Sequence, residues 1–315
     1  MRTSRLLLAP LAALVAGAAF SAGGCSLSRM GISAMERAIT RQGFTEQVYA
    51  DDEFTVRYWV GGSGPPLLLI HGFGGDGLGT WRGQLEAFAE HYTVIVPDLL
   101  WFGGSSGGTP GLDAQGRAQI ALLDHLSIPK ADVVNVSYGG FVTLSLLYLA
   151  PERVGRVVFQ DSPGPAFSES DVTELVARFG AESPEDIFVP TSGEDVGILL
   201  DLTFYDDPRV PGFILNDLHR NVFSINQEEQ RALLADLVGN RALGEALDLS
   251  QLKPLVVWGR YDEVFPLESG RALADMTGGE LVVIEEAAHG PSAEHPEAFN
   301  AAVLEYLGQT RKPTR

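Results

Sequence analysis

Short apolar runs recur along most of this chain, and they are the feature that most restricts its fold. Six runs of three or four mainly apolar residues lie at 67–70, 93–96, 133–136, 157–159, 255–258 and 281–284. Runs of this length with turn residues at their ends are typical of strands buried on both faces, as in a parallel sheet. We therefore expect a central sheet that is covered on both sides.

Amphipathic stretches of helical length separate these runs. They cover about 80–90, 113–126, 138–150, 266–276 and 294–307. Residues 54–60 instead alternate apolar and polar side chains, like a half-exposed strand. Strand–helix alternation implies βαβ units. The predicted fold class is therefore α/β, with a mostly parallel central sheet flanked by helices and built from residues 44–162 and 251–310.

One segment, residues 163–250, breaks this alternation. It contains several amphipathic helical stretches but no strong strand run, and prolines punctuate it. We interpret it as a helical cap inserted into the sheet domain. It carries 17 Asp and Glu against 5 Arg, a net charge of −12, so a cap that roofs a site would disfavour anionic substrates. A solvated acidic surface is an equally good interpretation of the same charge.

The whole chain of 315 residues has a formal net charge of −19. Nucleic-acid binding needs a basic surface that neutralises phosphates, so this charge argues against a nucleic-acid partner. It also argues against polyanionic substrates, which are repelled on approach. The simpler interpretation is that the acidity keeps the protein soluble.

We do not expect the first 25 residues to belong to the folded domain. Arg2 and Arg5 form a basic region, an apolar stretch of about 15 residues follows from Leu6 to Phe20, and small residues come next. This order is typical of a secretory signal. A helix needs roughly 20 apolar residues to span a bilayer, so a transmembrane anchor is the weaker alternative. The sequence predicts an exported protein.

The single cysteine, Cys25, stands where that signal ends, in the segment 22–26, which reads AGGCS. This segment resembles the bacterial lipobox, although Ala22 stands where Leu is usual. The resemblance implies that Cys25 is the lipidated first residue of the mature protein, held at a membrane by its acyl chains. Ser26 in place of Asp then indicates the outer membrane, where the cell has one. The alternative is plain secretion with cleavage after Ser21.

The candidate nucleophile is Ser137, in the segment 135–140, which reads NVSYGG. It follows a buried run and opens a helical stretch, as in the nucleophile elbow G-x-S-x-G, where Ser sits on a tight strand-to-helix turn. Gly139 supplies the small neighbour that such a turn needs. Asn135 stands where Gly is usual, but Asn tolerates unusual backbone angles better than most residues. The alternative is a Ser that only caps the helix.

A glycine-rich segment, 71–75 (HGFGG), directly follows the apolar run at 67–70. Acyl transfer places negative charge on an oxygen, and fixed N–H donors stabilise that charge by roughly 3–4 kcal/mol each. The candidate donors are the backbone N–H groups of Phe73 and Tyr138, the residue after the nucleophile. A phosphate cradle is less favoured, because G-x-G-x-x-G and the Lys of a P-loop are missing. A merely flexible turn is the other alternative.

A serine hydroxyl needs a base, and the chain has six histidines, at positions 71, 91, 125, 219, 289 and 295. Only His289 lies in a loop after a late apolar run and before the last helical stretch, so it is the candidate base. His71 belongs to the glycine-rich segment and is expected to be structural. The other four lie on or beside helical stretches and are expected at the surface.

The imidazole in turn needs a carboxylate that holds its tautomer and stabilises its cation. Asp262, four residues after Trp258, is the candidate, and Asp161, just after the run 157–159, is the competing acid. Asp98 is expected to brace a turn. No metal or cofactor is predicted, because the sequence has neither H-E-x-x-H nor a Cys/His cluster.

Residues 44–308 resemble the α/β-hydrolase superfamily. The resemblance rests on five segments in the family's order: 71–75 (HGFGG), 97–106 (PDLLWFGGSS), 137–140 (SYGG), 258–262 (WGRYD), and Ala288-His289 with Glu294-His295-Pro296. The chain order of nucleophile, acid and base also matches the family. The strongest similarity is to capped lipases and esterases of the monoacylglycerol-lipase-like kind, some of which are bacterial lipoproteins. Epoxide hydrolases and dehalogenases of this fold use an Asp nucleophile, so Ser137 counts against both.

The sequence thus predicts a serine hydrolase that cleaves carboxylic esters, such as acylglycerols or short- to medium-chain esters, through an acyl-enzyme intermediate. The predicted catalytic residues are Ser137, His289 and Asp262. Cleavage of C–C bonds or amides by the same residues is the first alternative. The second is a non-catalytic envelope-binding protein on a hydrolase fold. The expected partners are a small ester or lipid and, through the anchor, a membrane; no oligomeric state is predicted.

Overall fold

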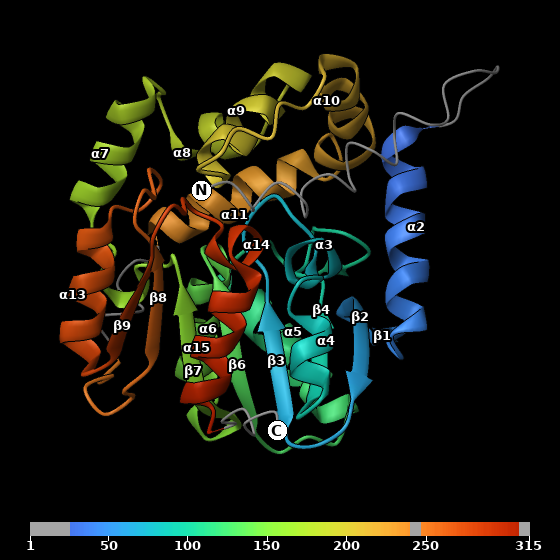
Figure 1. Ribbon diagram of the computed structural model, residues 1–315, viewed down its shortest axis with the longest axis vertical. Coiled ribbons are helices and arrows are strands. Elements are labelled where there is room, and N and C mark those ends of the chain that lie inside the picture. Colours follow the sequence, from blue (N-terminus) through green and yellow to red (C-terminus); the bar gives the residue numbers. More distant parts are fainter. Residues whose placement is uncertain (1–25, 240–246, 309–315) are drawn as a thin grey trace, which may run out of the picture.

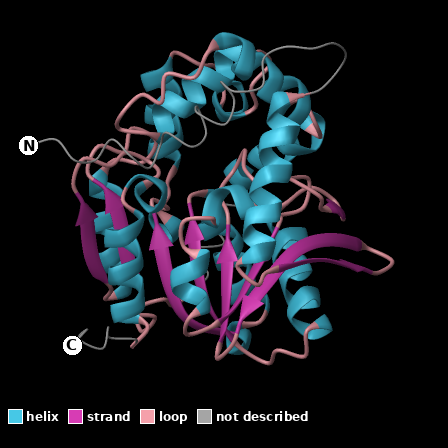
Figure 2. Cartoon of the chain, turned by 45° about the vertical axis from the view of Figure 1, so that its right-hand side comes forward, coloured by secondary structure: helices cyan, strands magenta, loops and turns pink. Residues whose placement is uncertain are grey.

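The structure is a computed structural model that describes residues 26–239 and 247–308. In this part of the chain nine strands form one twisted sheet, seen in Figures 1 and 2. The strands are β1 (Thr45–Ala50), β2 (Phe54–Gly62), β3 (Pro66–Ile70), β4 (Thr93–Pro97), β5 (Ser106–Gly107), β6 (Ala131–Val136), β7 (Val154–Gln160), β8 (Leu255–Gly259) and β9 (Glu280–Ile284). Their order is β1-β2-β4-β3-β6-β7-β8-β9, with β5 paired to β2.

The sheet is mostly parallel, as the apolar runs predicted. β4, β3, β6, β7, β8 and β9 pair in parallel, whereas β2 is antiparallel to β1, β4 and β5. The predicted α/β fold class is therefore confirmed. Two strands were not predicted: β1, whose side chains are nearly all exposed, and β5, which has two residues. Neither carries the apolar run by which buried strands are found.

Helices cover both faces of the sheet. Around the sheet lie α3 (Gly77–Trp81), α4 (Leu85–Ala89), α5 (Leu112–His125), α6 (Tyr138–Leu149), η1 (Pro151–Arg153), α13 (Leu267–Thr277), α14 (Pro291–Glu294) and α15 (Pro296–Tyr306). Successive side chains of a strand point to opposite faces. Leu68 and Ile70 of β3 accordingly join the core under α5, α6 and α13. Leu67 and Leu69 join the core under α3, α4 and α15.

The prediction of a single helix at about 80–90 is wrong, because two short helices occupy this region. α3 ends at Trp81 and α4 begins at Leu85. The buried Gln84 lies in the break, and its side-chain amide nitrogen, Nε2, donates to the carbonyl oxygen of Ser292 at 2.8 Å. The turn that brings Gln84 to this partner interrupts the helix, and no local pattern shows it.

The segment between β7 and β8 is helical in its described residues. It contains η2 (Gly164–Ala166), α7 (Glu169–Phe179), α8 (Pro184–Phe188), α9 (Gly193–Thr203), α10 (Gly212–Leu218), the π-helical η3 (His219–Phe223) and α11 (Gln227–Gly239). Figures 1 and 2 show α7 to α11 beyond the carboxyl ends of the parallel strands. Such edges collect the loops that carry function in α/β folds.

A helix that the sequence did not predict precedes the sheet. α2 (Leu27–Arg41) lies beside β1 and β2 at the edge of the sheet (Figure 1). At its start, the Ser26 hydroxyl and the Ser28 N–H both donate to Asp217 Oδ2 of α10, at 3.0 and 2.7 Å. Further along, Glu36 forms an ion pair with Arg57 of β2. The helix therefore connects the inserted helices to the sheet edge.

The predicted signal segment 1–25, with Cys25, lies outside the described residues. Within 26–239 and 247–308, no helix combines the length and the apolar character that crossing a bilayer requires.

Candidate active site

Ser137 stands on a strained turn between β6 and α6. Its backbone angles are φ 52° and ψ −121°, in a region that side-chain-bearing residues rarely adopt. A Cβ on Gly139 would lie only 2.6 Å from the carbonyl oxygens of Ile70 and His71, so the turn needs glycine at that position. Strain of this kind costs about 1–3 kcal/mol and is concentrated at functional sites. The local geometry is that expected of a nucleophile elbow.

Asn135, which replaces the usual first Gly of the elbow motif, lies in the core below the turn. It is fully buried on β6, opposite Ile70 of β3 and Phe159 of β7. A Cβ on Gly140 would lie 3.1 Å from its Oδ1 and 2.0 Å from Ser162 Oγ. The larger residue at 135 is thus accommodated because α6 presents glycine where it passes over the amide.

The glycine-rich loop after β3 reaches the nucleophile. A Cβ on Gly72 would lie 3.2 Å from Ser137 Cβ, so the loop backbone approaches the turn closely. Among the described residues, no protein acceptor is hydrogen-bonded to the backbone N–H of Phe73 or Tyr138. Phe73 lies on this loop and Tyr138 is the first residue of α6, so the oxyanion role of their N–H groups stays a prediction.

His71 holds this loop from below. Its Nδ1 donates to the carbonyl of Gly72 at 2.7 Å, and its Nε2 accepts the N–H of Leu99 at 2.8 Å. An imidazole that accepts at one nitrogen is neutral. Burial lowers the pKa of His71, although Asp98 opposes this shift. Asp98 braces the neighbouring turns, because it accepts the N–H groups of Gly77 and Gly104 at 2.9 Å each.

We expect His71 to make the fold sensitive to acid. A His with a lowered pKa gives its full stability above the ordinary value of about 6.5, and this stability is lost as the pH falls below that value. His71→Gln can keep both hydrogen bonds but cannot take up a proton. Urea unfolding at pH 7.5 and 5 should therefore show a smaller acid loss in His71→Gln than in the unsubstituted protein. His125→Gln, at an exposed position, is the control; equal losses in all three proteins would contradict the expectation.

His289 and Asp262 form a buried pair. His289 Nδ1 lies 2.8 Å from Asp262 Oδ2, and their side chains are 12% and 0% exposed. Asp262 Oδ1 accepts the N–H groups of Val264 and Phe265 at 2.8 and 3.0 Å. These two bonds fix the carboxyl group, whose other oxygen faces Nδ1; a carboxylate in this place holds a proton on Nδ1 and leaves Nε2 as the acceptor. The competing acid, Asp161, instead binds the backbone of Gly259.

Aromatic side chains connect the elbow helix with the imidazole. Phe141, one turn into α6, packs on Phe167 at 5.2 Å between ring centroids; Phe167 packs on Phe265 at 5.6 Å, and Phe265 on His289 at 5.7 Å. On the other side, Phe73 contacts Tyr138 and Phe188 of α8 at 5.6 and 6.5 Å. The surroundings of the predicted site are therefore apolar, and the inserted helices contribute to them.

Glu294 is a residue of this region to which the sequence assigned no role. Its Oε1 accepts the N–H of Ala288, next to His289, at 2.7 Å, and its Oε2 accepts the N–H of Tyr205 at 2.6 Å. It thereby links the histidine loop to the segment after α9. Burial raises the pKa of Glu294. Its place in the segment Glu294-His295-Pro296 was the only signal.

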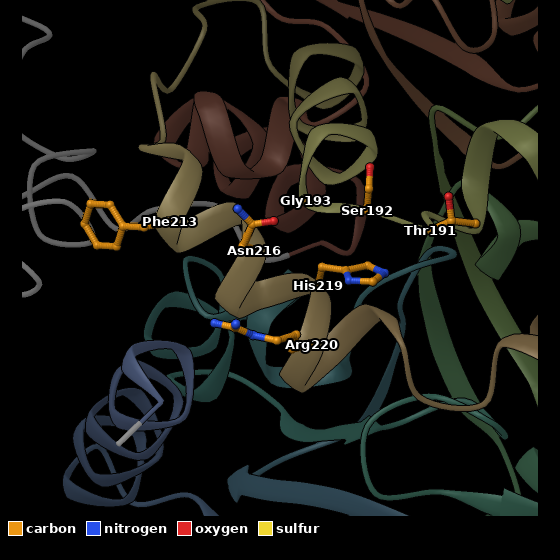
Figure 3. Close-up of a pocket in the computed structure, with 7 residues that line it drawn as sticks. All are labelled: Thr191, Ser192, Gly193, Phe213, Asn216, His219 and Arg220. Atoms are coloured by element: carbon orange, nitrogen blue, oxygen red, sulfur yellow. The ribbon is translucent and has the colours of Figure 1, made fainter. Parts of the chain in front are cut away.

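A separate surface pocket of about 490 Å³ lies within the inserted helices (Figure 3). It is lined by Thr191, Ser192, Gly193, Phe213, Asn216, His219 and Arg220. None of these belongs to the predicted triad or oxyanion loop. In the described ranges, no three His, Cys, Asp or Glu side chains are grouped so as to hold a metal ion.

Comparisons with known proteins show the family to which this chain is similar. Residues 65–296 match the family described as alpha/beta hydrolase fold. The dihydrolipoyllysine-residue acetyltransferase component of the acetoin cleaving system from Pseudomonas putida is 31% identical over 252 residues. That alignment covers 78% of this chain and 64% of the relative, so the chain spans less than two thirds of that protein.

A second relative is matched over most of its length. The 2-hydroxymuconate semialdehyde hydrolase of Pseudomonas sp. strain CF600 is 30% identical over 263 residues, which cover 79% of this chain and 88% of the relative. Among solved structures, a protein assigned as a lipase in Acinetobacter baumannii AYE superposes with a TM-score of 0.76 at 18% identity. It covers 93% of this chain and 98% of that chain, and at this identity the likeness concerns the fold alone.

Proposed function

The chain belongs to the alpha/beta hydrolase fold family, and from this premise we propose that it is a serine hydrolase that cleaves carboxylic esters. The observation that carries the proposal is the pairing of two features at one edge of the sheet. Ser137 stands on a strained elbow after β6, and a buried His289–Asp262 pair is carried by the loops after β9 and β8. The carboxyl ends of parallel strands share one edge, so these loops meet there.

The proposed reaction follows from the bonding of each group. Ser137 Oγ attacks the acyl carbonyl while His289 Nε2 takes its proton, and Asp262 stabilises the resulting imidazolium. The N–H groups of Phe73 and Tyr138 hold the oxyanion. His289 then protonates the leaving alcohol, which leaves an acyl-enzyme. Water activated by His289 releases the acid and restores Ser137.

Neutral, apolar esters suit this environment best. Phe73 packs on Tyr138 of the elbow and on Phe188, and Phe265 packs on His289. Burial of an apolar acyl or alcohol group against such side chains is favourable. The segment 163–250 carries a net charge of −12, so an anionic substrate is repelled on approach. We therefore propose acylglycerols or short- to medium-chain esters as the substrate class.

Hydrolysis of a C–C bond is the second candidate, because one relative at 30% identity is a 2-hydroxymuconate semialdehyde hydrolase. The two activities separate in one assay, in which the protein lacking residues 1–25 is offered p-nitrophenyl esters of increasing chain length and vinylogous diketone acids. We expect turnover of the esters and little or none of the diketone acids. The reverse preference would replace ester hydrolysis by C–C hydrolysis. Failure of a fluorophosphonate probe to label Ser137 would favour a non-catalytic binding protein.

We further propose that the protein is exported and anchored at the cell envelope through a lipid on Cys25, which stands at the end of the signal-like segment. Cys25→Ser should then move the full-length protein from the membrane fraction to the soluble fraction, because the acyl chains supply the membrane affinity. Ser26→Ala, next to it, is the matched control and should leave the fractionation unchanged. Unchanged fractionation of Cys25→Ser would contradict lipid anchoring.

A further inference from the structure

The end of β7 lies between the two loops that carry the proposed nucleophile and acid. β7 pairs with β6 on one side and with β8 on the other. The carbonyl of Gln160, its last residue, accepts the N–H of Ser137 at 2.9 Å. The next residue, Asp161, donates its own N–H to the carbonyl of Val257 in β8 at 3.1 Å. Two successive residues therefore hold the turn of Ser137 on one side and strand β8 on the other.

The side chain of Asp161 adds a contact to the loop that carries the acid. Its Oδ1 accepts the N–H of Gly259 at 2.8 Å. Gly259 ends β8, and its carbonyl accepts the N–H of Asp262 at 3.3 Å. A Cβ on Gly259 would lie 1.8 Å from the carbonyl oxygen of Ala288, the residue before His289. Holding Gly259 therefore positions the backbone that leads to both members of the pair.

Asp161 has a backbone conformation that is rare for a residue with a side chain. Its φ is 43°, in the left-handed region, and its side chain is fully buried. An outlier of this kind persists only where the surroundings enforce it, and such residues cluster at functional sites. Here the left-handed turn directs the carboxyl group toward Gly259.

We propose that Asp161 is a positioning residue of the site, whose carboxyl group holds the end of β8 so that Asp262 stays within hydrogen-bonding reach of His289. The inference rests on the proposed serine-hydrolase function. Asp161 touches neither substrate nor imidazole in this role, and it acts through Gly259.

The surroundings of Asp161 favour its neutral form. Burial raises the pKa of the Asp161 carboxyl well above its usual range, and the negative charges of Asp262 and Glu294 raise it further. The Gly259 N–H and the Gln160 side chain oppose the shift. A neutral Asp161 adds no negative charge of its own beside the His289–Asp262 pair.

The test compares three substitutions. Asp161→Ala removes the acceptor, Asp161→Gly removes it and also relieves the left-handed strain, and Asp161→Asn keeps an acceptor and tolerates the conformation. We expect kcat to fall about 10²-fold in Ala and Gly with KM nearly unchanged, which is the scale of a displacement by about 1 Å. Asn should restore kcat to within about threefold. Asp132→Ala is the matched control. Asp132 also accepts a backbone N–H from the neighbouring strand, that of Arg156 at 2.8 Å, but at the opposite end of the sheet. The kcat of Asp132→Ala should therefore not change.

A second measurement remains available where Ala or Gly does not fold. An Asp with a raised pKa gives stability that is present below the ordinary value of about 3.9 and is lost as the pH rises through the raised value. As the pH rises from 4 to 8, the urea midpoint of Asp161→Asn should therefore increase relative to that of the unsubstituted protein. A difference in urea midpoint that stays constant between pH 4 and 8 would contradict a neutral Asp161 carboxyl group. An unchanged kcat in Asp161→Ala or Asp161→Gly would overturn the positioning role. An Asp161→Asn variant as slow as Asp161→Ala would overturn it as well. If the unsubstituted protein hydrolyses no ester, the proposed function fails by itself, and the rate of fluorophosphonate labelling of Ser137 replaces kcat in the comparison.

Discussion

Ser137→Ala should lower ester turnover by roughly 10⁴-fold or more, which is the usual effect of removing a triad nucleophile. The substitution removes the attacking oxygen and leaves the backbone of the turn in place. The Phe73 and Tyr138 N–H groups remain, so a small residual rate over water is expected from the oxyanion site. The measurement is kcat/KM on the best p-nitrophenyl ester, with fluorophosphonate labelling of the same preparations.

The control for this experiment is Ser145→Ala. Ser145 is buried on α6, the helix that Ser137 precedes, so it tests the loss of a buried hydroxyl without the loss of the nucleophile. We expect Ser145→Ala to keep its turnover within about threefold, the range of changes that do not touch the reacting groups. A Ser137→Ala protein that retains a tenth of the activity would exclude Ser137 as the nucleophile.

Asp262→Asn should lower kcat by about 10⁴-fold while the fold is retained, because the substitution imposes the wrong imidazole tautomer. The amide oxygen can still accept the N–H groups of Val264 and Phe265, which the carboxylate accepts at 2.8 and 3.0 Å. The amide nitrogen then faces His289 as a donor. The imidazole must accept at Nδ1 and carry its proton on Nε2, where it cannot take the proton of Ser137.

The matched comparison is Asp161→Asn, at the neighbouring buried carboxyl group. Both substitutions remove one potential negative charge from the same end of the sheet, but only Asp262 contacts the imidazole. A loss of about 10⁴-fold at Asp262 and of at most about threefold at Asp161 separates the triad acid from the positioning residue. Equal losses at both positions, measured by kcat on the same ester, would contradict this division of roles.

Much of the sheet was predictable because its strands are buried on both faces. Burial on both faces leaves a continuous apolar run in the sequence, as at Leu67–Ile70 or Leu255–Trp258, and each predicted run lies within a strand. β1 leaves no such run, because nearly all of its side chains are exposed. α2 was missed for a related reason: only Ser28 and Ile39 are buried in it, and its place depends on contacts with Asp217 and Arg57, which are distant in sequence.

The residues of the proposed site differ in how far local sequence reveals them. Ser137 and the loop with Phe73 are marked by glycines, since close backbone approach leaves no room for a Cβ at Gly139 and little at Gly72. Glu294 carries no such mark. In the sequence it is only one member of the family segment 294–296, and its two hydrogen bonds join backbone groups at residues 205 and 288, which are distant from each other along the chain.

By itself the sequence determined the buried strands of the sheet and the edge at which the candidate site residues gather, because buried runs and tight glycine turns are local constraints on the backbone. It could only favour, and not decide, which acid serves His289. Asp161 and Asp262 both follow a parallel strand within four residues and therefore reach the same edge. The tertiary structure decided between them: a left-handed turn directs Asp161 toward the Gly259 N–H, whereas the loop after β8 carries Asp262 to 2.8 Å from the imidazole. The direction of a buried side chain depends on partners distant in sequence, and folding alone brings those partners together.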